Sequence, residues 1–319
     1  MQTAQRCFGT RTLPHFGLLA ALLALPIGCA AAPGGRPWRA KPDPNGVTFE
    51  DAGRQLLRYR YGDAPFKPYI ESLRTPAGVN VLLDAPPDHL HHHGLMYAVN
   101  VDGLEFWGEP SGAGRQVPRY LQILAPTAVG GLHRTGLLQT LNWTSAQGRT
   151  VLQEKRTIEV WRSADLDASL ISWQSELRAP PDKPSVELTG RNYFGLGMRF
   201  LRSMDTGGRF FNADRGQDVA GTNDVSSHWC AYAAQAGGQP VTVAMFDHPA
   251  NPRPIRWFTM DKPFAYLSAT PGLHHKNLTL EKKNPLRFRF GVALWDGPAD
   301  ASRIERIYRR WAKLPPEVP

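Results

Sequence analysis

The fold is decided by a long alternating stretch, Arg149-Thr-Val-Leu-Gln-Glu-Lys-Arg-Thr-Ile-Glu-Val-Trp-Arg162. Apolar and polar residues alternate over much of it, which is typical of a β-strand with one face against a hydrophobic core. A similar run, Leu170-Ile-Ser-Trp-Gln-Ser-Glu-Leu177, follows a turn at residues 163–167. The two runs therefore predict a long antiparallel hairpin.

Short strand-like runs continue outward from this hairpin in both directions. They are rich in β-branched and aromatic residues and are separated by Gly, Pro, Asn and Asp, as in turns. These runs are Gln55–Tyr61, Val79–Leu83, Leu95–Val101, Tyr120–Leu124, Leu137–Trp143, Val186–Leu188, Val241–Phe246, Phe264–Ser268, Leu278–Leu280 and Leu286–Leu294. Only Asp300–Leu314 has helical spacing. We predict an all-β fold, a large antiparallel β-sandwich with a C-terminal helix, in a single domain over residues 46–319.

Residues 1–32 have the pattern of an export signal. Arg6 and Arg11 precede an apolar run over residues 16–27, and small residues follow. That run is too short to span a bilayer, which takes about 20 apolar residues. We therefore expect an exported protein that is periplasmic or associated with the envelope.

Two kinds of signal cleavage remain open. A lipoprotein signal would end before Cys29 and anchor the chain through a lipid, whereas ordinary cleavage would use the small residues 30–32. Residues 33–45 are rich in Pro, Gly and Ala, so we expect a flexible tether before the domain. Cys230 would then be the one cysteine of the domain, which excludes an intrachain disulfide.

The formal net charge of the chain is +9. Its Lys and Arg residues are scattered instead of blocked, so nucleic acid is not an expected partner. A small sugar or oligosaccharide, with anionic groups, is the expected partner; the alternative is a soluble protein that is merely basic.

The segment with the most evident chemistry contains His89, His91, His92 and His93. In an extended chain, His92 projects to one side and the other three to the opposite side. Neighbouring imidazoles transfer protons near neutral pH or bind a divalent metal, so we predict His92 as a catalytic residue and His91 as a substrate contact. His91 and His93 are the candidate metal ligands, and the cofactor is left open. The alternative is a polar turn with structural hydrogen bonds.

A second candidate segment is the proline-rich loop over residues 246–257. Asp247 and His248 are predicted as a catalytic acid–base pair, with Asn251 as a hydrogen-bonding group and Trp257 as an apolar platform. The same residues also suit a rigid loop with an Asx turn, which is the structural alternative.

Five further residues complete the predicted site. Arg199 is expected to point from a strand into the cavity, where its guanidinium suits a carboxylate or vicinal hydroxyls; a surface arginine is the alternative. Substrate contacts are predicted for Trp107, Glu109, His228 and Trp229, of which Trp229 also suits a core position. The nine tryptophans and nine tyrosines of the chain suit stacking on sugar rings.

The run Asp88-His-Leu-His-His-His-Gly-Leu95, with Asn100-Val-Asp-Gly-Leu-Glu-Phe-Trp107, resembles a family labelled PmoA or methane oxygenase, also treated as the family of unknown function DUF6807. The resemblance extends through residues 229–232, 247–252 and 296–297. The oxygenase label implies an integral membrane subunit with several spanning helices, which this sequence does not offer, so we reject that activity. The family's strand pattern is similar to galactose-mutarotase-like supersandwiches, and the resemblance implies a role in sugar utilisation.

Two functional hypotheses follow. The first is an exported carbohydrate-active enzyme of glycoside hydrolase, lyase or epimerase type, using histidine acid–base chemistry on a sugar held at a concave sheet face. Because no matched pair of carboxylates stands out, elimination or proton abstraction beside a carbonyl is favoured over two-carboxylate hydrolysis. The alternative is a non-catalytic envelope module that binds glycans.

Overall fold

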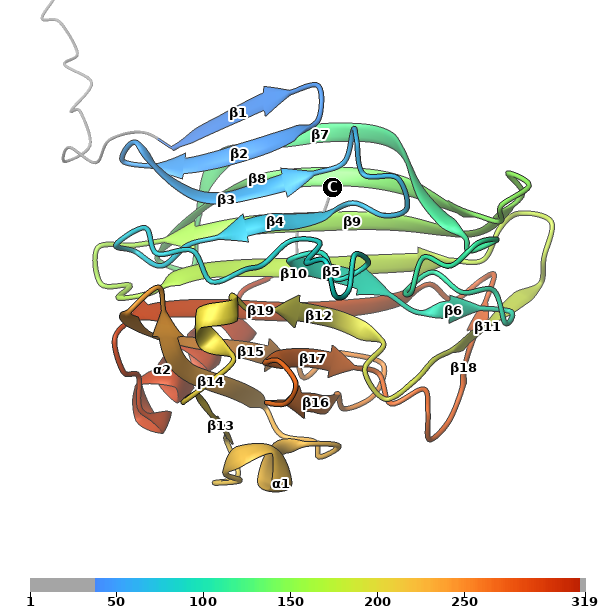
Figure 1. Cartoon of the computed structure of the whole chain (residues 1–319). Coiled ribbons are helices and arrows are strands. Elements are labelled where there is room, and N and C mark those ends of the chain that lie inside the picture. Colours follow the sequence, from blue (N-terminus) through green and yellow to red (C-terminus); the bar gives the residue numbers. More distant parts are fainter. Residues whose placement is uncertain (1–37, 316–319) are drawn as a thin grey trace, which may run out of the picture. The chain divides into compact units, whose positions relative to one another are not determined.

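The predicted hairpin is formed by β9 (Thr150–Arg162) and β10 (Ser169–Arg178), which pair antiparallel with Leu170 opposite Trp161. It lies near the middle of a large sheet in the computed structural model, which describes residues 38–315 (Figure 1). These residues belong to one compact unit, Arg36–Pro319. The expected signal sequence and Cys29 lie outside the described residues.

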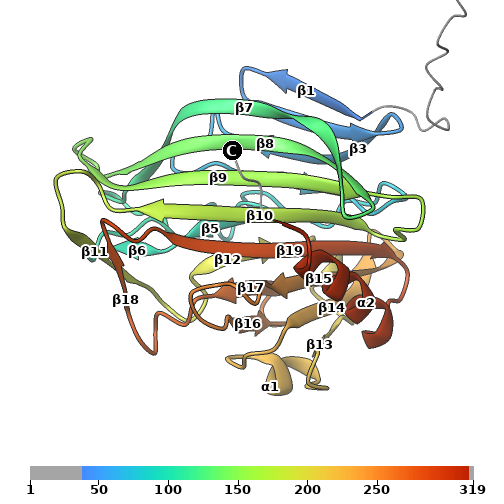
Figure 2. The ribbon, with the colours of Figure 1, turned by 180° about the vertical axis from the view of Figure 1, so that it is seen from behind.

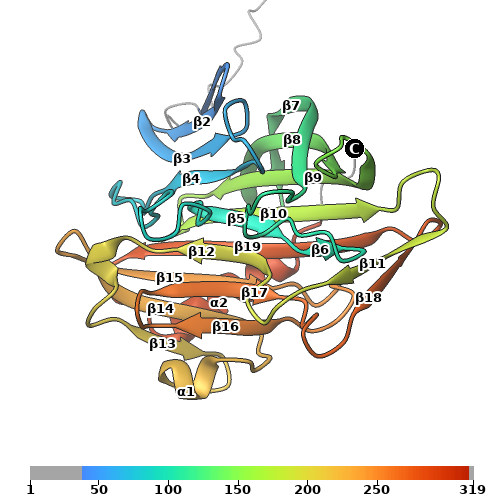
Figure 3. The ribbon, with the colours of Figure 1, turned by 45° about the vertical axis from the view of Figure 1, so that its right-hand side comes forward.

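Two eight-stranded antiparallel sheets form the layers of a sandwich (Figure 3). Sheet I has the order β1 (Arg39–Asp43), β2 (Gly46–Asp51), β3 (Arg54–Arg60), β4 (Tyr69–Leu73), β5 (Leu95–Ala98), β12 (Gly195–Arg199), β17 (Tyr266–Thr270) and β16 (Arg256–Met260). Sheet II has the order β13 (Arg209–Asn212), β14 (Trp229–Ala236), β15 (Gln239–Asp247), β19 (Leu286–Asp296), β10, β9, β8 (Leu132–Thr144) and β7 (Arg115–Val129). A small sheet contains β18 (Leu278–Glu281), β11 (Ser185–Thr189) and β6 (Asn100–Val101). The predicted antiparallel β-sandwich is confirmed.

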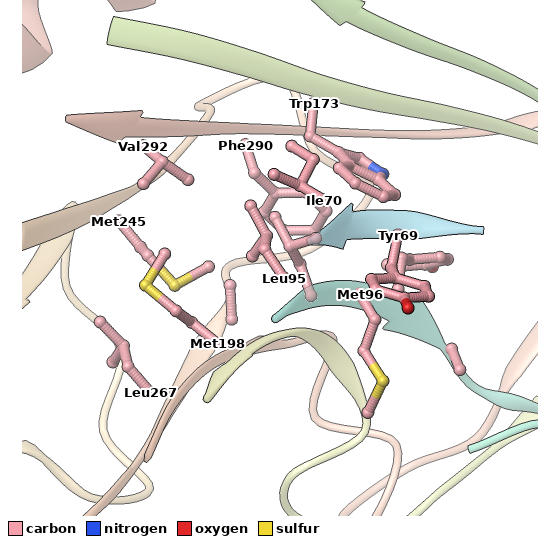
Figure 4. Close-up of a cluster of buried hydrophobic side chains, with 14 of the residues drawn as sticks. Tyr69, Ile70, Leu95, Met96, Trp173, Met198, Met245, Leu267, Phe290 and Val292 are labelled. Carbon is pink, nitrogen blue, oxygen red and sulfur yellow. The ribbon is translucent and has the colours of Figure 1, made fainter. Parts of the chain in front are cut away.

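Apolar side chains from the two sheets interleave between the layers (Figure 4). Each of these side chains is buried, and burial of apolar surface stabilises a fold by about 25 cal/mol per Å². Sheet I contributes Ile70, Leu95, Met198 and Leu267, and sheet II contributes Trp173, Met245, Phe290 and Val292. The main core therefore lies between the sheets.

Sheet II is covered on both faces, so β10 and β19 are buried over nearly their whole length. Trp173 and Phe290 face the core between the sheets, whereas Leu170 and Ala293 belong to a second core under α2 (Ala301–Ala312). Figure 2 shows α2 against this outer face. Coverage of both faces explains why a simple alternation of apolar and polar residues breaks down in these strands.

Helix α2 confirms the helix predicted near residues 300–314. It begins after Asp300, whose carboxylate accepts a hydrogen bond from the Arg303 N–H at 2.8 Å and so caps the first turn. Its buried face consists of Ile304, Ile307, Tyr308 and Trp311. Among the described residues, no helix is long and apolar enough to cross a membrane.

The tether predicted for residues 33–45 is wrong in its second half. Arg39–Asp43 forms β1 and pairs with β2, and the Asn45 N–H donates to the Asp43 carboxylate at 2.9 Å in the connecting turn. Pro42 is tolerated because β1 is an edge strand, where proline disturbs the hydrogen-bond ladder least. Residues 33–37 lie outside the described part of the chain.

Several strand boundaries also differ from the sequence prediction. Residues 79–83 form isolated bridges instead of a regular strand. Strands β2, β4, β13, β14 and β16 are not among the strands predicted from the sequence, and neither are the short helix α1 (Asp218–Thr222) and the 3-10 helix Arg202–Met204. Strand β14 illustrates the reason, because its alanine-rich sequence has low strand propensity and pairing with β13 and β15 fixes it instead.

An ion pair lies on the core-facing side of β9. The Arg156 guanidinium donates to both carboxylate oxygens of Glu154, with its Nε and Nη2 at 2.9 and 2.8 Å, and neither side chain is exposed. Arg156 also donates to the Tyr59 hydroxyl at 3.2 Å, the Pro68 carbonyl at 2.9 Å and the Gln116 side chain at 2.8 Å. Because Tyr59 belongs to sheet I, this arginine connects the two layers.

Replacing Glu154 with Gln is expected to lower the free energy of unfolding by about 3–5 kcal/mol, because Arg156 would stay buried without its counter-charge. Urea unfolding followed by circular dichroism measures this change. The control is Lys41→Ala, which removes the surface ion pair with Glu50 at 2.6 Å and should cost less than about 1 kcal/mol. Equal losses in the two variants would contradict a structural role for the buried pair.

Candidate functional site

A cavity of about 490 Å³ opens on the outer face of sheet I, and we call it the histidine cavity. Its walls are mostly aromatic and histidine side chains, and its size suits a small ligand. The lining residues are His89, His91, His92, Glu105, Trp107, Gly108, Pro110, Arg191, Tyr193, Phe258, Met260, Phe264 and Tyr266.

Strands β16 and β17 form the floor of this cavity. Phe258 and Met260 are two residues apart in β16 and therefore point to the same face, and Tyr266 of β17 pairs with Met260. The next residue of β17, Leu267, points to the opposite face, into the core between the sheets (Figure 4). The cavity therefore lies on the side of sheet I that faces away from sheet II.

The histidine segment is a turn, as in the structural alternative, and the alternation expected for an extended chain does not occur. The His89 N–H donates to the Pro86 carbonyl and the His92 N–H donates to the His89 carbonyl, both at 2.9 Å. The Ala85 N–H closes the loop by donating to the His92 carbonyl at 2.9 Å. As a result His89, His91 and His92 all line the cavity, instead of alternating between two sides.

The three imidazoles pack on one another and on the aromatic wall. The rings of His89 and His92 are stacked with their centroids 4.5 Å apart. Trp107 lies edge-on to both His91 and His92 at 5.2 Å, and Phe264 lies edge-on to His89 at 4.9 Å. Of the predicted site residues, His91, His92 and Trp107 are therefore brought together in one cavity.

Burial makes the three histidines chemically different. It lowers the pKa of His92 to about 2, with the nearby rings of His91 and His89 adding to the effect, so His92 is neutral near pH 7. Burial, followed by the charge of Lys67, also lowers the pKa of His91. His89 is held by Asp88, whose carboxylate oxygen lies 2.9 Å from the His89 Nδ1. This contact leaves the Nε2 of His89 as the nitrogen available to a ligand.

His93 points away from the cavity into a buried ionic network. Its Nδ1 lies 2.8 Å from Asp84, its Nε2 lies 3.2 Å from Glu109, and Glu109 is also paired with Lys67. Burial opposes protonation of His93, but the bonds to Asp84 and Glu109 outweigh it and raise its pKa. Since both ring nitrogens are bound to carboxylates, the predicted metal pair of His91 and His93 is wrong. Glu109 belongs to this network and does not line the cavity.

Three polar atoms at the cavity are buried without a hydrogen-bond partner among residues 38–315. They are the Nδ1 of His92, the Nε1 of Trp107 and the hydroxyl of Tyr266. Buried polar atoms are nearly always paired, because an unpaired one costs about 1–3 kcal/mol. These three atoms have almost no accessible surface, so a polar ligand in the cavity pairs with them only when the neighbouring side chains shift.

The proline-rich loop lines a separate cavity of about 320 Å³ beside α2, which shares no lining residue with the histidine cavity. Four predicted site residues line it: His228, Asp247, His248 and Asn251. The structure therefore does not bring Asp247 and His248 together with His91 and His92. The reason is that β15, which carries Asp247, belongs to sheet II.

The second cavity has its own internal bonds. Asn251 donates to the Asp247 carboxylate at 2.8 Å and to the Arg289 carbonyl at 3.0 Å, and its carbonyl accepts from the Arg289 N–H at 2.7 Å. Burial raises the pKa of Asp247 to about 6, and burial together with the charge of Arg289 lowers the pKa of His248 to about 4. His228 stacks on Tyr308 at 5.4 Å. The amide of Asn251 is thus occupied by bonds within the loop, as in the structural alternative.

Arg199 is buried behind the wall of the histidine cavity. Its guanidinium carbon lies 3.9 Å from the centre of the Phe264 ring, and its Nη1 donates to Asp205 at 3.1 Å and to the Ala265 carbonyl at 3.2 Å. It does not line the cavity, contrary to the prediction, because these bonds hold it beneath Phe264. Arg199 therefore positions an aromatic wall residue.

Trp229 and Trp257 are core residues and line neither of these two cavities. The Trp229 Nε1 donates to Glu305 of α2 at 2.8 Å, and the Trp257 Nε1 donates to the Ser227 carbonyl at 3.0 Å. Both side chains are almost fully buried. Their predicted contacts with substrate are therefore not supported by their positions.

The sequence prediction missed several residues of the histidine cavity. Asp88 adjoins His89 in the sequence, so the motif itself contained a signal for this pair. The other missed residues come from loops and strand positions that gave no sign of which face they occupy: Arg191, Tyr193, Phe258, Met260, Phe264 and Tyr266.

A family model matches residues 46–309, which is most of the chain. The chain belongs to the family of unknown function DUF6807. The resemblance read from the histidine motif is thereby confirmed. Comparison of this DUF6807 protein with curated proteins found no match.

Among solved structures, the DUF6807 chain is similar to a GH36 α-galactosidase from Geobacillus stearothermophilus, with 9% identity and a TM-score of 0.49 over 82% of this chain and 41% of that chain. It is similar to an α-galactosidase from Lactobacillus brevis, with 7% identity and a TM-score of 0.49 over 86% and 42%. A candidate mutarotase from Salmonella typhimurium has 10% identity and a TM-score of 0.36 over 82% and 97%. The chain spans about two fifths of the length of these α-galactosidases. At these identities the similarity concerns the fold and not the chemistry of the site.

Replacing His93 of this DUF6807 protein with Asn is expected to destabilise the fold more at low pH than at high pH. The folded-state pKa of His93 is raised above the ordinary value of 6.5, so the stabilisation by its charged form is complete below that value and is lost as pH rises through the folded pKa. We expect a loss of about 3 kcal/mol at about pH 6 and a smaller loss at about pH 9.

Urea unfolding at both pH values measures this difference, with His133→Asn as the control at an exposed position of β8. A loss that is independent of pH would show that His93 acts by packing and not by charge.

Proposed function

We propose that this protein is an exported carbohydrate-active enzyme that transfers protons to and from a sugar bound in the histidine cavity. The observation that carries the proposal is the set of three imidazoles on one cavity wall, one of them held by a carboxylate. Histidine near neutral pH is the side chain best suited to exchange protons with a substrate. Export, and a lipid anchor at Cys29, are proposed from the signal-like pattern of residues 1–32.

The walls of the cavity support a sugar as the ligand. Tyr193 and Phe258, which are half-buried, offer aromatic surface that can stack on the apolar faces of sugar rings, whereas Trp107 is buried and stacked on Phe194. The unpaired Nε1 of Trp107 and hydroxyl of Tyr266 offer hydrogen bonds that hydroxyl groups can accept or donate. The volume of about 490 Å³ falls within the range of about 300–1,000 Å³ that is usual for small-molecule sites. The exposed Arg191 at the rim suits an anionic group on the sugar.

The environments of the histidines assign their roles. His89 is the proposed acid–base residue, since the contact of its Nδ1 with Asp88 fixes the orientation of the ring, as in other carboxylate–histidine pairs. His91, beside it on the same wall, is the second proton-transfer group. His92 keeps too low a pKa to carry a proton near neutral pH, so it acts as a neutral hydrogen-bonding group. This replaces the role of His92 that its sequence position suggested.

The carboxylate content of the cavity limits the reaction class. Glu105 is the one carboxylate among the lining residues, and its Oε1 accepts the Gly108 N–H at 3.1 Å. Hydrolysis by two carboxylates is therefore not supported, and we propose elimination or epimerisation beside a carbonyl. In the elimination, the Nε2 of His89 takes the proton from the carbon next to the carbonyl, and the electron pair of that C–H bond moves toward the carbonyl oxygen. As the carbonyl re-forms, a C=C bond forms, the C–O bond at the following carbon breaks, and His91 on the same wall gives a proton to the departing oxygen.

A non-catalytic module that binds glycans is the second candidate. The aromatic walls and the unpaired polar atoms of the cavity suit it equally well. The two candidates differ in whether His89 is needed for turnover.

His89→Ala is expected to reduce turnover of a sugar found by library screening at least about 100-fold, because general acid–base catalysis by one residue contributes about 10²–10⁴-fold. Asp88→Asn should lower turnover less, since the imidazole remains. Turnover is measured by product formation, and binding is measured separately by calorimetry.

His133→Ala, on the exposed face of β8, is the control and should leave both measurements unchanged. Sugar binding without any turnover in the wild type, and unchanged binding in His89→Ala, would replace the enzyme proposal by the glycan-binding module.

The variant Tyr266→Phe distinguishes a role of the Tyr266 hydroxyl in sugar binding from a role in the stability of the fold. The variant removes a buried hydroxyl that has no partner among the described residues, so the free energy of unfolding should stay the same or rise by about 1 kcal/mol. Sugar affinity should fall about tenfold, because the hydroxyl is then missing where a ligand would pair with it. Urea unfolding and calorimetry measure the two quantities. A loss of stability with unchanged affinity would place the hydroxyl outside the binding site.

A further inference from the structure

A second group of metal-binding side chains lies outside both cavities. It consists of Asp224, in the loop after α1, and of His274 and His275, in the loop after β17. The Nε2 of His274 lies 3.1 Å from the Asp224 Oδ1, and the Nε2 of His275 lies 3.0 Å from the same oxygen and 2.9 Å from Oδ2. One potential ligand atom from each residue lies within 4.8 Å of the other two.

The backbone fixes this arrangement. The Asp224 N–H donates to the Trp257 carbonyl at 2.7 Å, and Val225 forms a bridge with Trp257, so the loop is fastened to β16. The His275 N–H donates to the Gly272 carbonyl at 3.1 Å in a tight turn. Asp224 adopts a positive φ of 55°, which is uncommon for a residue with a side chain. The two loops are therefore held close before any ligand binds.

We propose that Asp224, His274 and His275 bind a divalent transition-metal ion, with Zn²⁺ as the representative ion. Zinc bonds to histidine nitrogen and carboxylate oxygen are about 2.0–2.2 Å long, which places neighbouring ligand atoms of a tetrahedron about 3.3 Å apart. The distance of 2.9 Å between the His275 Nε2 and the Asp224 Oδ2 is close to that spacing, and one potential ligand atom from each of the three residues lies within 4.8 Å of the other two. This site does not depend on the proposed sugar chemistry.

The donor set favours one class of metal. Two imidazoles and one carboxylate suit Zn²⁺, Fe²⁺, Co²⁺ and similar ions, whereas Ca²⁺ and Mg²⁺ prefer oxygen ligands throughout. The His275 side chain is 51% exposed, so solvent reaches the cluster. Three protein ligands beside solvent leave a coordination position for water or a ligand, as in catalytic zinc sites.

Arg256 is the residue that opposes a cation here, since its Nε lies 2.6 Å from the Asp224 Oδ1. The second carboxylate oxygen, Oδ2, lies 2.9 Å from the His275 Nε2 and can face the metal while Oδ1 keeps the guanidinium bond. Hydrogen bonds of this kind to metal-binding carboxylates are a usual outer-shell feature. Arg256 also donates to the Asp224 backbone carbonyl, which keeps it in place.

The proposed metal site adjoins the histidine cavity. Arg256 and Phe258 are two residues apart in β16 and share its outer face, where Phe258 lines the cavity. Two residues of a strand span about 7 Å. A metal at Asp224 therefore lies on the same face of sheet I as the proposed sugar site.

Calorimetric titration of the full chain, without an affinity tag, with ZnCl₂ tests the proposal. We expect saturable binding of one ion per chain. His275→Ala should weaken zinc affinity at least about 100-fold, which is more than loss of a residue that only hydrogen-bonds to a metal ligand usually causes. His275 is half exposed, so this variant should fold, and circular dichroism checks that it does. CaCl₂ should give no binding.

His91→Ala is the matched variant, because the histidine cavity also contains imidazoles. Zinc binding that survives His91→Ala and is lost in His275→Ala supports the proposal. The proposal is overturned if the wild type shows no saturable zinc binding, if His275→Ala binds zinc as the wild type does, or if Ca²⁺ binds as tightly as Zn²⁺.

Discussion

The two sheets of the sandwich pack around the buried guanidinium of Arg156, which keeps its positive charge. A guanidinium stays protonated even when buried, so Arg156, on the inner face of β9, requires acceptors from every side. Glu154 supplies the counter-charge from the same strand, and Tyr59 and Gln116 supply oxygens from β3 of sheet I and β7 of sheet II. Gln116 in turn donates to the Tyr97 carbonyl in β5 at 2.8 Å. Each of these hydrogen bonds forms only when the two sheets are correctly aligned. The bonds of Arg156 therefore fix the relative position of the sheets more specifically than apolar contacts do.

A second buried ionic group makes the histidine cavity possible. Lys67, Glu109, His93 and Asp84 form a chain of opposite charges behind the turn at residues 88–92. Their bonds hold His93 in the interior, and the remaining histidines of the segment then have only the cavity side available. Adjacent residues of one motif thus divide into a structural anchor and a ligand-facing group. His93 becomes the anchor because both of its ring nitrogens contact carboxylates, Asp84 on one side and Glu109 on the other.

The sequence predicted those features that depend on local periodicity. The hairpin of β9 and β10 and the helix α2 follow from apolar spacing, and the family follows from the histidine motif. His92 and His248 line separate cavities, and the sequence could not show this because spacing along the chain does not say to which layer a strand belongs. Likewise, the turn that gathers the histidines depends on backbone bonds to Pro86 and Ala85 and not on side-chain alternation. An aromatic residue such as Trp229 is equally compatible with a core and with a sugar platform until its burial is known.

The unpaired atoms of the cavity connect stability with function. A protein of this size gains most of its stability from apolar burial and gives up about 1–3 kcal/mol for each buried polar atom left without a partner. In the part of the chain that the structure describes, His92, Trp107 and Tyr266 place such atoms at a single wall. A ligand with several hydroxyl groups would satisfy these atoms and recover part of that free energy on binding, which would make the site selective for polar ligands over apolar ones of the same shape.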